Sequence, residues 1–223
     1  MQSPFLCSAV FSSVEFCGLI QPMSNKNKST LILHGWGGNK PEHWQEHLAA
    51  TLTNAGQTVY YPKLPEPTAP NLELWITGQE AALAAAGDSE NLTVVCHSLG
   101  AITYLHVAAR AGKKLAERVL LVAPPYVVPG IPPWSAPATV DTFFPPPLSA
   151  AAIAQAATTT HLVGGNDDDY ATWEQMETYA KRLGIACTML TEAGHISPYW
   201  GYGKWDWVEN WCLGTADLPP QPR

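Results

Sequence analysis

The sequence has few charged residues and contains no cluster of lysine and arginine. Asp, Glu, Lys and Arg together make up 14% of the 223 residues, and the formal net charge is −7. Proteins that bind nucleic acid or an anionic membrane surface generally need a concentrated positive patch. We therefore expect neither nucleic acid nor a membrane as a partner. Hydrophobic residues make up 46% of the chain, a share typical of a folded domain.

Cysteine is also scarce and is not arranged in pairs. The five cysteines are irregularly spaced, and no two of them form a C-x-x-C motif. Small secreted domains held together by disulfides have more cysteines at closer spacing. The cysteine content therefore indicates free thiols in a reducing compartment, and we expect a cytoplasmic protein.

The N-terminal segment lacks the features of a targeting signal. No positive charge precedes its apolar stretches, and Ser12-Ser13-Val14-Glu15 interrupts them. It therefore matches neither a secretory signal peptide nor a membrane span. We expect residues 1–28 to be a disordered extension, or to lie largely before a native start at Met23. Residues 214–223 contain three prolines and are predicted to form a disordered tail.

Between these ends, short apolar runs alternate with segments of helical periodicity. This alternation predicts an α/β fold in which a mostly parallel sheet of about six strands lies between two layers of helices. One domain is expected over residues 29–213, without internal repeats. The expected strands are residues 30–34, 57–61, 92–96, 118–122, 159–163 and 186–190. The expected helices are residues 41–55, 72–86, 99–112, 149–157, 172–183 and 204–212.

The segment Cys96-His97-Ser98-Leu99-Gly100 carries the strongest chemical signal. It joins an expected strand to an expected helix, which places Ser98 at a sharp turn. Small residues two before and two after the serine are needed there, because the strand and the helix nearly touch. Cys96 stands where glycine is usual, but cysteine is still small. The segment predicts a nucleophile elbow, and the alternative is an ordinary turn in which Ser98 caps the helix.

A serine nucleophile needs a base and an orienting carboxylate, and α/β-hydrolases supply them in the chain order Ser, acid, His. Two segments after Ser98 fit this order. One strand runs into the acidic loop Asp167-Asp168-Asp169, and a later strand is followed by Gly194-His195. The loop could instead be a solvated turn or a weak calcium loop, although it lacks the ligand pattern of an EF-hand. Any of the three aspartates could serve as the acid at this point.

The first expected strand is followed by the glycine-rich segment His34-Gly35-Trp36-Gly37-Gly38. Neither G-x-x-x-x-G-K-[ST] nor G-x-G-x-x-G occurs here, which argues against a phosphate-binding loop. In the α/β-hydrolase fold, the loop after an early strand supplies one N–H group of the oxyanion hole. We therefore expect the N–H groups of Trp36 and Leu99 to form that hole.

One other motif suggests a different chemistry. The segment His43-Trp44-Gln45-Glu46-His47 matches H-x-x-E-H, a zinc-protease signature. Zinc needs a third protein ligand, and no candidate follows at a suitable spacing. We favour an ordinary helix in which His43 and His47 share a partly exposed face, and we expect no metal.

Residues 124–147 contain nine prolines, and a loop of this length is often a lid or a binding loop. The alternative is a packed structural excursion without contact to substrate. Tyr126 and Trp134 would give such a lid an apolar inner face, and Tyr199 lies in a second aromatic segment after His195. We predict that these three residues and His97, which would form part of the cleft wall, contact the substrate.

The sequence resembles the small serine hydrolases grouped with retinoblastoma-binding protein 9 and its bacterial YdeN-like relatives, within the α/β-hydrolase superfamily. The resemblance covers roughly residues 28–212. It is carried by four motifs: His34-Gly35-Trp36-Gly37, His97-Ser98-x-Gly100, Gly165-x-Asp167-Asp168 with Trp173, and Ala193-Gly194-His195. The family pattern places its acid five residues before an aromatic residue. Because that residue is Trp173 here, the resemblance implies that Asp168 is the acid, with Asp167 second.

Taken together, the motifs and the resemblance predict a serine hydrolase that cleaves a small carboxylic ester. Ser98 would be the nucleophile, His195 the base and Asp168 the orienting acid, with no cofactor. The first alternative is a hydrolase fold that binds a protein partner with little or no catalysis, because a fold does not determine a function. The second is cleavage of a thioester, lactone or amide by the same three residues.

Overall fold

The structure is a computed structural model that describes residues 28–38, 40–127 and 138–223. Six parallel strands form one sheet in the order β2-β1-β3-β4-β5-β6. They are β1 (Ser29–Leu33), β2 (Thr58–Tyr60), β3 (Leu92–His97), β4 (Ala116–Val122), β5 (Ala157–Gly165) and β6 (Ala186–Leu190). All of the residues of β1 and β3 are buried, so the centre of the sheet is apolar on both faces, as parallel sheets require.

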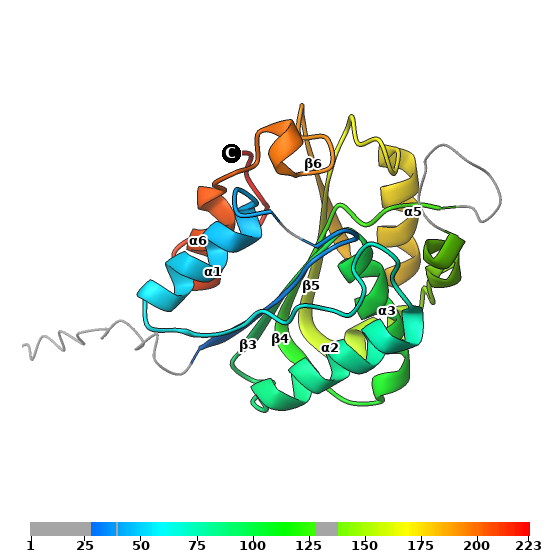
Figure 1. The fold of residues 1–223 in the computed structure, drawn as a ribbon, viewed down its shortest axis with the longest axis horizontal. Helices are drawn as coiled ribbons and strands as arrows, with labels where there is room; N and C mark the ends of the chain where they lie inside the picture. Colours follow the sequence, from blue (N-terminus) through cyan, green and yellow to red (C-terminus); the bar gives the residue numbers. More distant parts are fainter. Residues whose placement is uncertain (1–27, 39, 128–137) are drawn as a thin grey trace, which may run out of the picture.

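Helices cover both faces of the sheet, which gives the three predicted layers (Figure 1). One face packs against α1 (Trp44–Asn54) and α6 (Asp206–Leu213). The other face packs against α2 (Leu72–Ala86), α3 (Leu99–Ala111), α4 (Ala150–Ala156) and α5 (Trp173–Leu183). Successive strand residues divide between the two cores: Val94 and Cys96 face one, and Val95 faces the other.

The expected elements are present, with shifts at their ends that have local causes. The first helix begins at Trp44 instead of residue 41, because His43 caps it by accepting from the N–H of Gln45. Part of the proline-rich segment forms a 3₁₀ helix, η2 (Ala138–Phe143). There Phe143 is fully buried and packs edge-on against Trp75, so this part of the segment belongs to the core.

The C-terminal residues, for which the sequence predicts disorder, pack against α6 and the residues before it. Trp207 Nε1 donates to the carbonyl oxygen of Asp217 at 3.1 Å, and Trp205 Nε1 donates to that of Gln221 at 2.7 Å. The Arg223 guanidinium lies 4.9 Å from the ring centroid of Tyr202. The physical reason is that buried indole N–H groups need acceptors, and here the tail supplies them.

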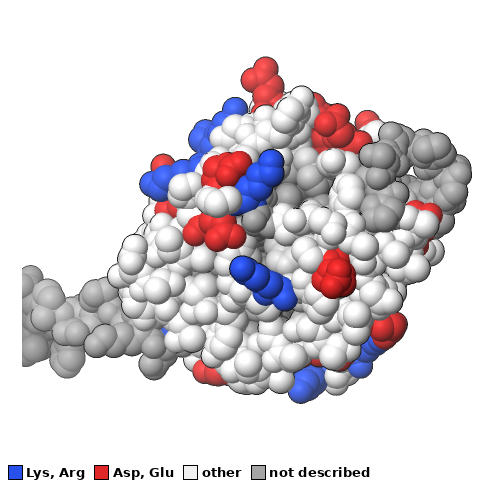
Figure 2. Space-filling model, viewed as in Figure 1, with Lys and Arg blue, Asp and Glu red and all other residues white. Residues whose placement is uncertain are grey.

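Charged side chains are sparse in the sequence, where they make up 14% of the residues. On the face turned to the reader in Figure 2, uncharged residues predominate, and lysines and arginines lie interspersed with acidic residues. In the part of the chain that the structure describes, no helix combines the length and the hydropathy needed to cross a bilayer.

Candidate active site

Ser98 lies at a strained turn between β3 and α3. Its backbone has φ 54° and ψ −125°, in a region that residues with a side chain rarely adopt and that is typical of functional sites. Its side chain makes no capping bond to α3, so the interpretation of Ser98 as an ordinary helix cap is wrong. Cys96, two residues earlier, is fully buried on the side of the sheet covered by α2–α5, and this burial raises the pKa of its thiol.

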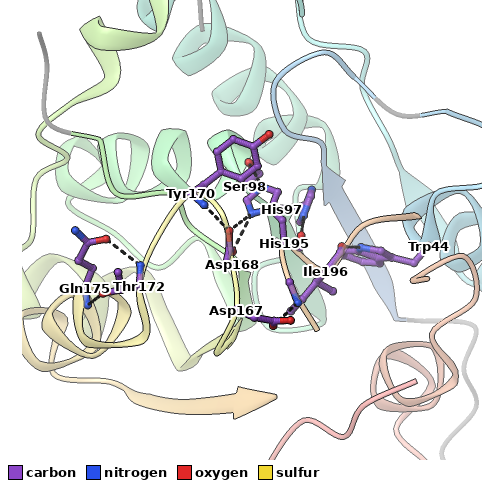
Figure 3. Close-up of polar contacts among 11 residues, drawn as sticks. Trp44, His97, Ser98, Asp167, Asp168, Tyr170, Thr172, Gln175, His195 and Ile196 are labelled. Carbon is purple, nitrogen blue, oxygen red and sulfur yellow. Dashed lines mark hydrogen bonds and ion pairs between the residues drawn. The ribbon is translucent and has the colours of Figure 1, made fainter. Parts of the chain in front are cut away.

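A continuous chain of hydrogen bonds joins Ser98, His195 and Asp168 (Figure 3). Ser98 Oγ lies 2.8 Å from His195 Nε2. His195 Nδ1 donates to both carboxylate oxygens of Asp168, at 2.9 and 3.0 Å. The carboxylate is completely shielded from solvent, and the imidazole is 10% exposed. In such a water-poor site, electrostatic interactions between the three groups are stronger than in bulk water.

The acidic loop after β5 uses its polar side chains for two different purposes. Asp168 pairs with His195 and also accepts from the N–H of Tyr170 at 2.8 Å. Asp167 instead accepts from the N–H of Gly194 at 2.8 Å. Asn166, just before it, accepts from the N–H of Glu192 at 3.0 Å. Asn166 and Asp167 therefore hold the main chain before His195, and Asp168 holds the His195 imidazole.

Two N–H groups near Ser98 are free to bind a ligand oxygen. Within the described residues, neither the N–H of Leu99, at the start of α3, nor that of Trp36 has an acceptor. The loop after β1 approaches Ser98 closely: a Cβ atom added to Gly35 would lie 2.7 Å from the Cβ of Ser98. Only glycine fits this position. The free N–H of Leu99 at a helix N-terminus is suited to stabilising a negatively charged oxygen.

Three further histidines surround the site and are kept neutral by burial. Burial lowers the pKa of His34 and of His97, and it lowers the pKa of His43 to about 3. The positive charge that His195 could carry lowers the pKa of His43 and His97 further. His34 bridges two loops, because its Nδ1 donates to the carbonyl oxygen of Gly35 and its Nε2 accepts from the N–H of Leu64. The three neighbouring imidazoles therefore add no positive charge beside His195, and Asp168 is its charged partner.

A cavity of about 520 Å³ opens onto Ser98 and His195. Among the four residues predicted to contact substrate, His97 and Tyr199 line it, and Tyr199 is 88% exposed. Tyr126 does not line it and instead packs against Tyr179, with ring centroids 5.2 Å apart. Trp134 lies outside the described residues. The rest of the lining is mainly apolar and includes Trp36, Leu99, Pro125, Val140 and Tyr170, but two charged residues, Lys40 and Glu42, also belong to it.

The two histidines of the H-x-x-E-H segment do not share an exposed face. His43 is buried and its Nδ1 is occupied by the N–H of Gln45, whereas His47 is exposed. The intervening Glu46 accepts from the hydroxyl of Tyr61 at 3.0 Å. No group of three His, Cys, Asp or Glu side chains is arranged to hold a metal ion within the described ranges. The expectation of one partly exposed His face is therefore wrong, because His43 turns inward to cap α1.

Sequence reasoning missed two aromatic residues beside His195. The Tyr170 ring lies 4.4 Å from the His195 ring, edge-on, and Tyr170 also lines the cavity. Its position two residues after Asp168 could have indicated this. Trp44 Nε1 donates to the carbonyl oxygen of Ile196 at 2.8 Å. No local signal could have revealed that contact, because 152 residues separate Trp44 from Ile196.

The family of the chain follows from a comparison with known protein families. A family model described as serine hydrolase matches residues 30–212. No curated protein matches the sequence.

Solved structures that resemble the chain include two YdeN-type proteins. The chain matches the ydeN gene product from B. subtilis with a TM-score of 0.71 and 20% identity, over 84% of this chain and 98% of that one. It matches a putative YdeN-like hydrolase from Pectobacterium atrosepticum with a TM-score of 0.65 and 17% identity, over 86% and 92%. It also matches Est1E from Butyrivibrio proteoclasticus with a TM-score of 0.64 and 14% identity, over 86% of this chain and 89% of that one. These likenesses show that the fold is that of the α/β-hydrolases.

Proposed function

The chain belongs to the serine hydrolase family, and we propose that it hydrolyses a small carboxylic ester through an acyl-enzyme intermediate on Ser98. The observation that carries this proposal is the hydrogen-bonded chain from Asp168 through His195 to Ser98. A serine hydroxyl becomes a useful nucleophile only when a positioned base takes its proton. The buried carboxylate keeps the proton of the neutral imidazole on Nδ1, so Nε2 is free to act as that base.

In the first half of the proposed reaction, Ser98 Oγ attacks the ester carbonyl carbon and His195 Nε2 accepts the hydroxyl proton. The negative charge that develops on the carbonyl oxygen is stabilised by the N–H groups of Leu99 and Trp36, each contributing about 3 kcal/mol. Asp168 stabilises the imidazolium. His195 then donates its proton to the leaving alcohol, which leaves the acyl group on Ser98. In the second half, the oxygen of a water molecule attacks the acyl carbon while His195 Nε2 takes its proton. The bond from the acyl carbon to Ser98 Oγ then breaks, His195 returns the proton to Oγ, and the acid is released.

The substrate is proposed to be a small-molecule ester with an apolar acyl or aromatic part. The cavity of about 520 Å³ is lined mainly by apolar side chains together with Lys40 and Glu42, and an apolar lining suits an acyl or aromatic group. Cleavage of a thioester or an amide would use the same groups. The hydrogen-bonded set of Ser98, His195 and Asp168 argues against the other alternative, a protein-binding module without catalysis. The cysteines of the described ranges, Cys96, Cys187 and Cys212, are free, in keeping with the proposed cytoplasmic location.

The proposal is tested by labelling the purified protein with a fluorophosphonate and mapping the adduct by mass spectrometry. The adduct is expected on Ser98 and should be absent from Ser98→Ala and strongly reduced in His195→Ala. A panel of short esters, thioesters and amides then separates the three substrate classes. A folded wild-type protein that forms no adduct and hydrolyses none of the panel would overturn the proposal in favour of a binding module.

A further inference from the structure

The main chain around His195 is strained. Glu192, Gly194 and Ile196 have φ values of 53°, 49° and 46°. Positive φ is uncommon for residues with a side chain, and for a β-branched residue such as Ile196 it is a true outlier. Such a conformation persists only where the surrounding structure holds it in place. The contacts of this loop therefore determine where the His195 imidazole points.

Three hydrogen bonds from distant residues hold this loop (Figure 3). Asp167 accepts from the N–H of Gly194 at 2.8 Å. His97 Nε2 donates to the carbonyl oxygen of His195 at 2.9 Å, and Trp44 Nε1 donates to that of Ile196 at 2.8 Å. Both donors are buried, with Trp44 fully shielded and His97 5% exposed. Without them, two adjacent carbonyl groups would lose their hydrogen-bond donors in a buried site, which is unfavourable.

We propose that His97 and Trp44 are positioning residues that together hold the main chain of His195 so that its imidazole stays against Ser98. This inference rests on the proposed function, because it assigns the pair a role in the transfer of the Ser98 proton. His97 directly precedes Ser98 in the chain, so its bond to His195 ties the backbone of the nucleophile to the backbone of the base. Trp44 comes from α1 and fixes the next residue of the loop.

The two donors also support each other. The His97 and Trp44 rings meet edge-on with centroids 5.8 Å apart, and the His97 and His195 rings lie 5.0 Å apart. A carbonyl oxygen can only accept, so His97 carries its proton on Nε2. Burial and the neighbouring His195 lower the pKa of His97, which keeps the ring neutral. It therefore adds no charge that would oppose the imidazolium formed on His195 during the reaction.

The test compares matched variants of the full chain in steady-state assays with the ester that the wild-type protein cleaves fastest. His97→Phe and Trp44→Phe remove one N–H donor each and keep an aromatic ring, and His97→Gln restores a donor. Trp207→Phe is the control, because it removes a buried indole bond to the carbonyl oxygen of Asp217, away from His195. A displacement of about 1 Å at the reacting groups lowers rates by about 100-fold.

We expect kcat to fall about 10- to 100-fold in His97→Phe and Trp44→Phe, with KM nearly unchanged because ground-state binding is not affected. His97→Gln should recover most of the loss, and Trp207→Phe should match the wild type in kcat. Losses in the double variant His97→Phe/Trp44→Phe should be less than multiplicative, because both bonds hold one loop. If His97→Phe and Trp44→Phe lower the melting temperature but keep the wild-type kcat, as expected for Trp207→Phe, the inference is wrong.

A second readout does not depend on turnover. Proton NMR detects the His195 Nδ1–H, which its bond to Asp168 shifts to low field. The signal should be present in the wild type, His97→Gln and Trp207→Phe, and weakened or lost in His97→Phe and Trp44→Phe. A wild-type protein that gives this signal but cleaves no ester would count against the proposed reaction alone. A signal unchanged in His97→Phe and Trp44→Phe would overturn the positioning role.

Discussion

The turn at Ser98 and the loop at His195 both contain strained backbone, but the strain is held in different ways. At Ser98 the positive φ falls between the last residue of β3 and the first residue of α3. Two regular elements therefore fix the turn from either side. The loop at His195 follows the edge strand β6 and contains three residues with positive φ. Its holding contacts come from β3, α1 and the loop after β5.

This difference teaches that the two halves of the site depend on different parts of the sequence. The Ser98 turn needs small neighbours, and Gly100 supplies one: a Cβ added there would collide with the carbonyl oxygen of His34. The His195 loop needs particular donors and acceptors far away in the chain. Substitutions that remove such a partner should disturb His195 while leaving the Ser98 turn intact.

The largest effect is expected from Asp168→Asn. An amide at this position favours the wrong tautomer of His195, and the corresponding change in other Ser-His-Asp enzymes lowers kcat by about 10⁴-fold. Asp167→Asn is the matched control, because its remaining side-chain oxygen can still accept from the N–H of Gly194. We expect a loss of less than about 10-fold in that variant, since one charge-assisted bond becomes a neutral one. If Asp168→Asn and Asp167→Asn lose kcat/KM to the same extent, the two aspartates do not have the different roles proposed for them.

The second prediction concerns the strained backbone of the loop at His195 and its effect on the free energy of unfolding. Gly194→Ala places a Cβ on a residue with φ 49° and directs it into the ring of Trp200. We expect the free energy of unfolding to fall by about 2–4 kcal/mol, from the left-handed backbone together with overpacking. Gly37→Ala is the control, since Gly37 has φ 80° but no atom within 4 Å of the added Cβ. That variant should lose only the backbone part, about 1 kcal/mol.

Urea denaturation of both variants measures these losses, and fluorophosphonate labelling shows whether Ser98 still reacts. If Gly194→Ala is no less stable than Gly37→Ala, the contact with Trp200 is not a constraint on the loop.

The smallest effect is a dependence of stability on pH. Burial lowers the pKa of His43 to about 3 in the folded protein, against about 6.5 in the unfolded chain. Below the unfolded value, the unfolded state binds a proton that the folded state does not. The free energy of unfolding therefore falls as the pH drops from about 6.5 towards 3, by up to about 1.4 kcal/mol per pH unit for this group.

Thermal unfolding between pH 7 and pH 5 measures this slope. His43→Asn retains an oxygen that can cap α1 but does not titrate, so its melting temperature should depend less on pH than that of the wild type. His97 acts in the same direction, because burial also lowers its pKa, and some slope should remain in the variant. A slope unchanged by His43→Asn would mean that His43 is not held neutral.

Much of the site was predictable because its chemistry follows strands. Ser98, Asp168 and His195 each lie shortly after the end of a parallel strand, and these ends meet at one edge of the sheet. The three Asp residues of the acidic loop all follow the same strand, so their position alone did not show which of them is the acid. The choice of Asp168 came from the resemblance, and the structure gives the physical difference: its carboxylate is fully buried against His195, whereas Asp167 accepts from Gly194.

The residues that sequence reasoning misplaced depend on side-chain direction. Tyr126 was expected in the cavity, but its ring packs against Tyr179. The C-terminal residues were expected to be disordered, but they accept from the indoles of Trp205 and Trp207. Proline content and aromatic composition do not specify which partner a side chain meets, so neither outcome was accessible from the local sequence.

The sequence by itself determined the order of strands and helices, the strained turn at Ser98 and the glycines that allow close approach to it. These features depend on periodicity, residue size and backbone conformation, which act over a few neighbouring residues. Only the tertiary structure decided how Asp167 and Asp168 divide their contacts between Gly194 and His195, that His43 is buried, and that His97 and Trp44 donate to the loop at His195. Those outcomes depend on hydrogen bonds between residues up to 152 positions apart, and such pairings exist only once the sheet has brought the loops together.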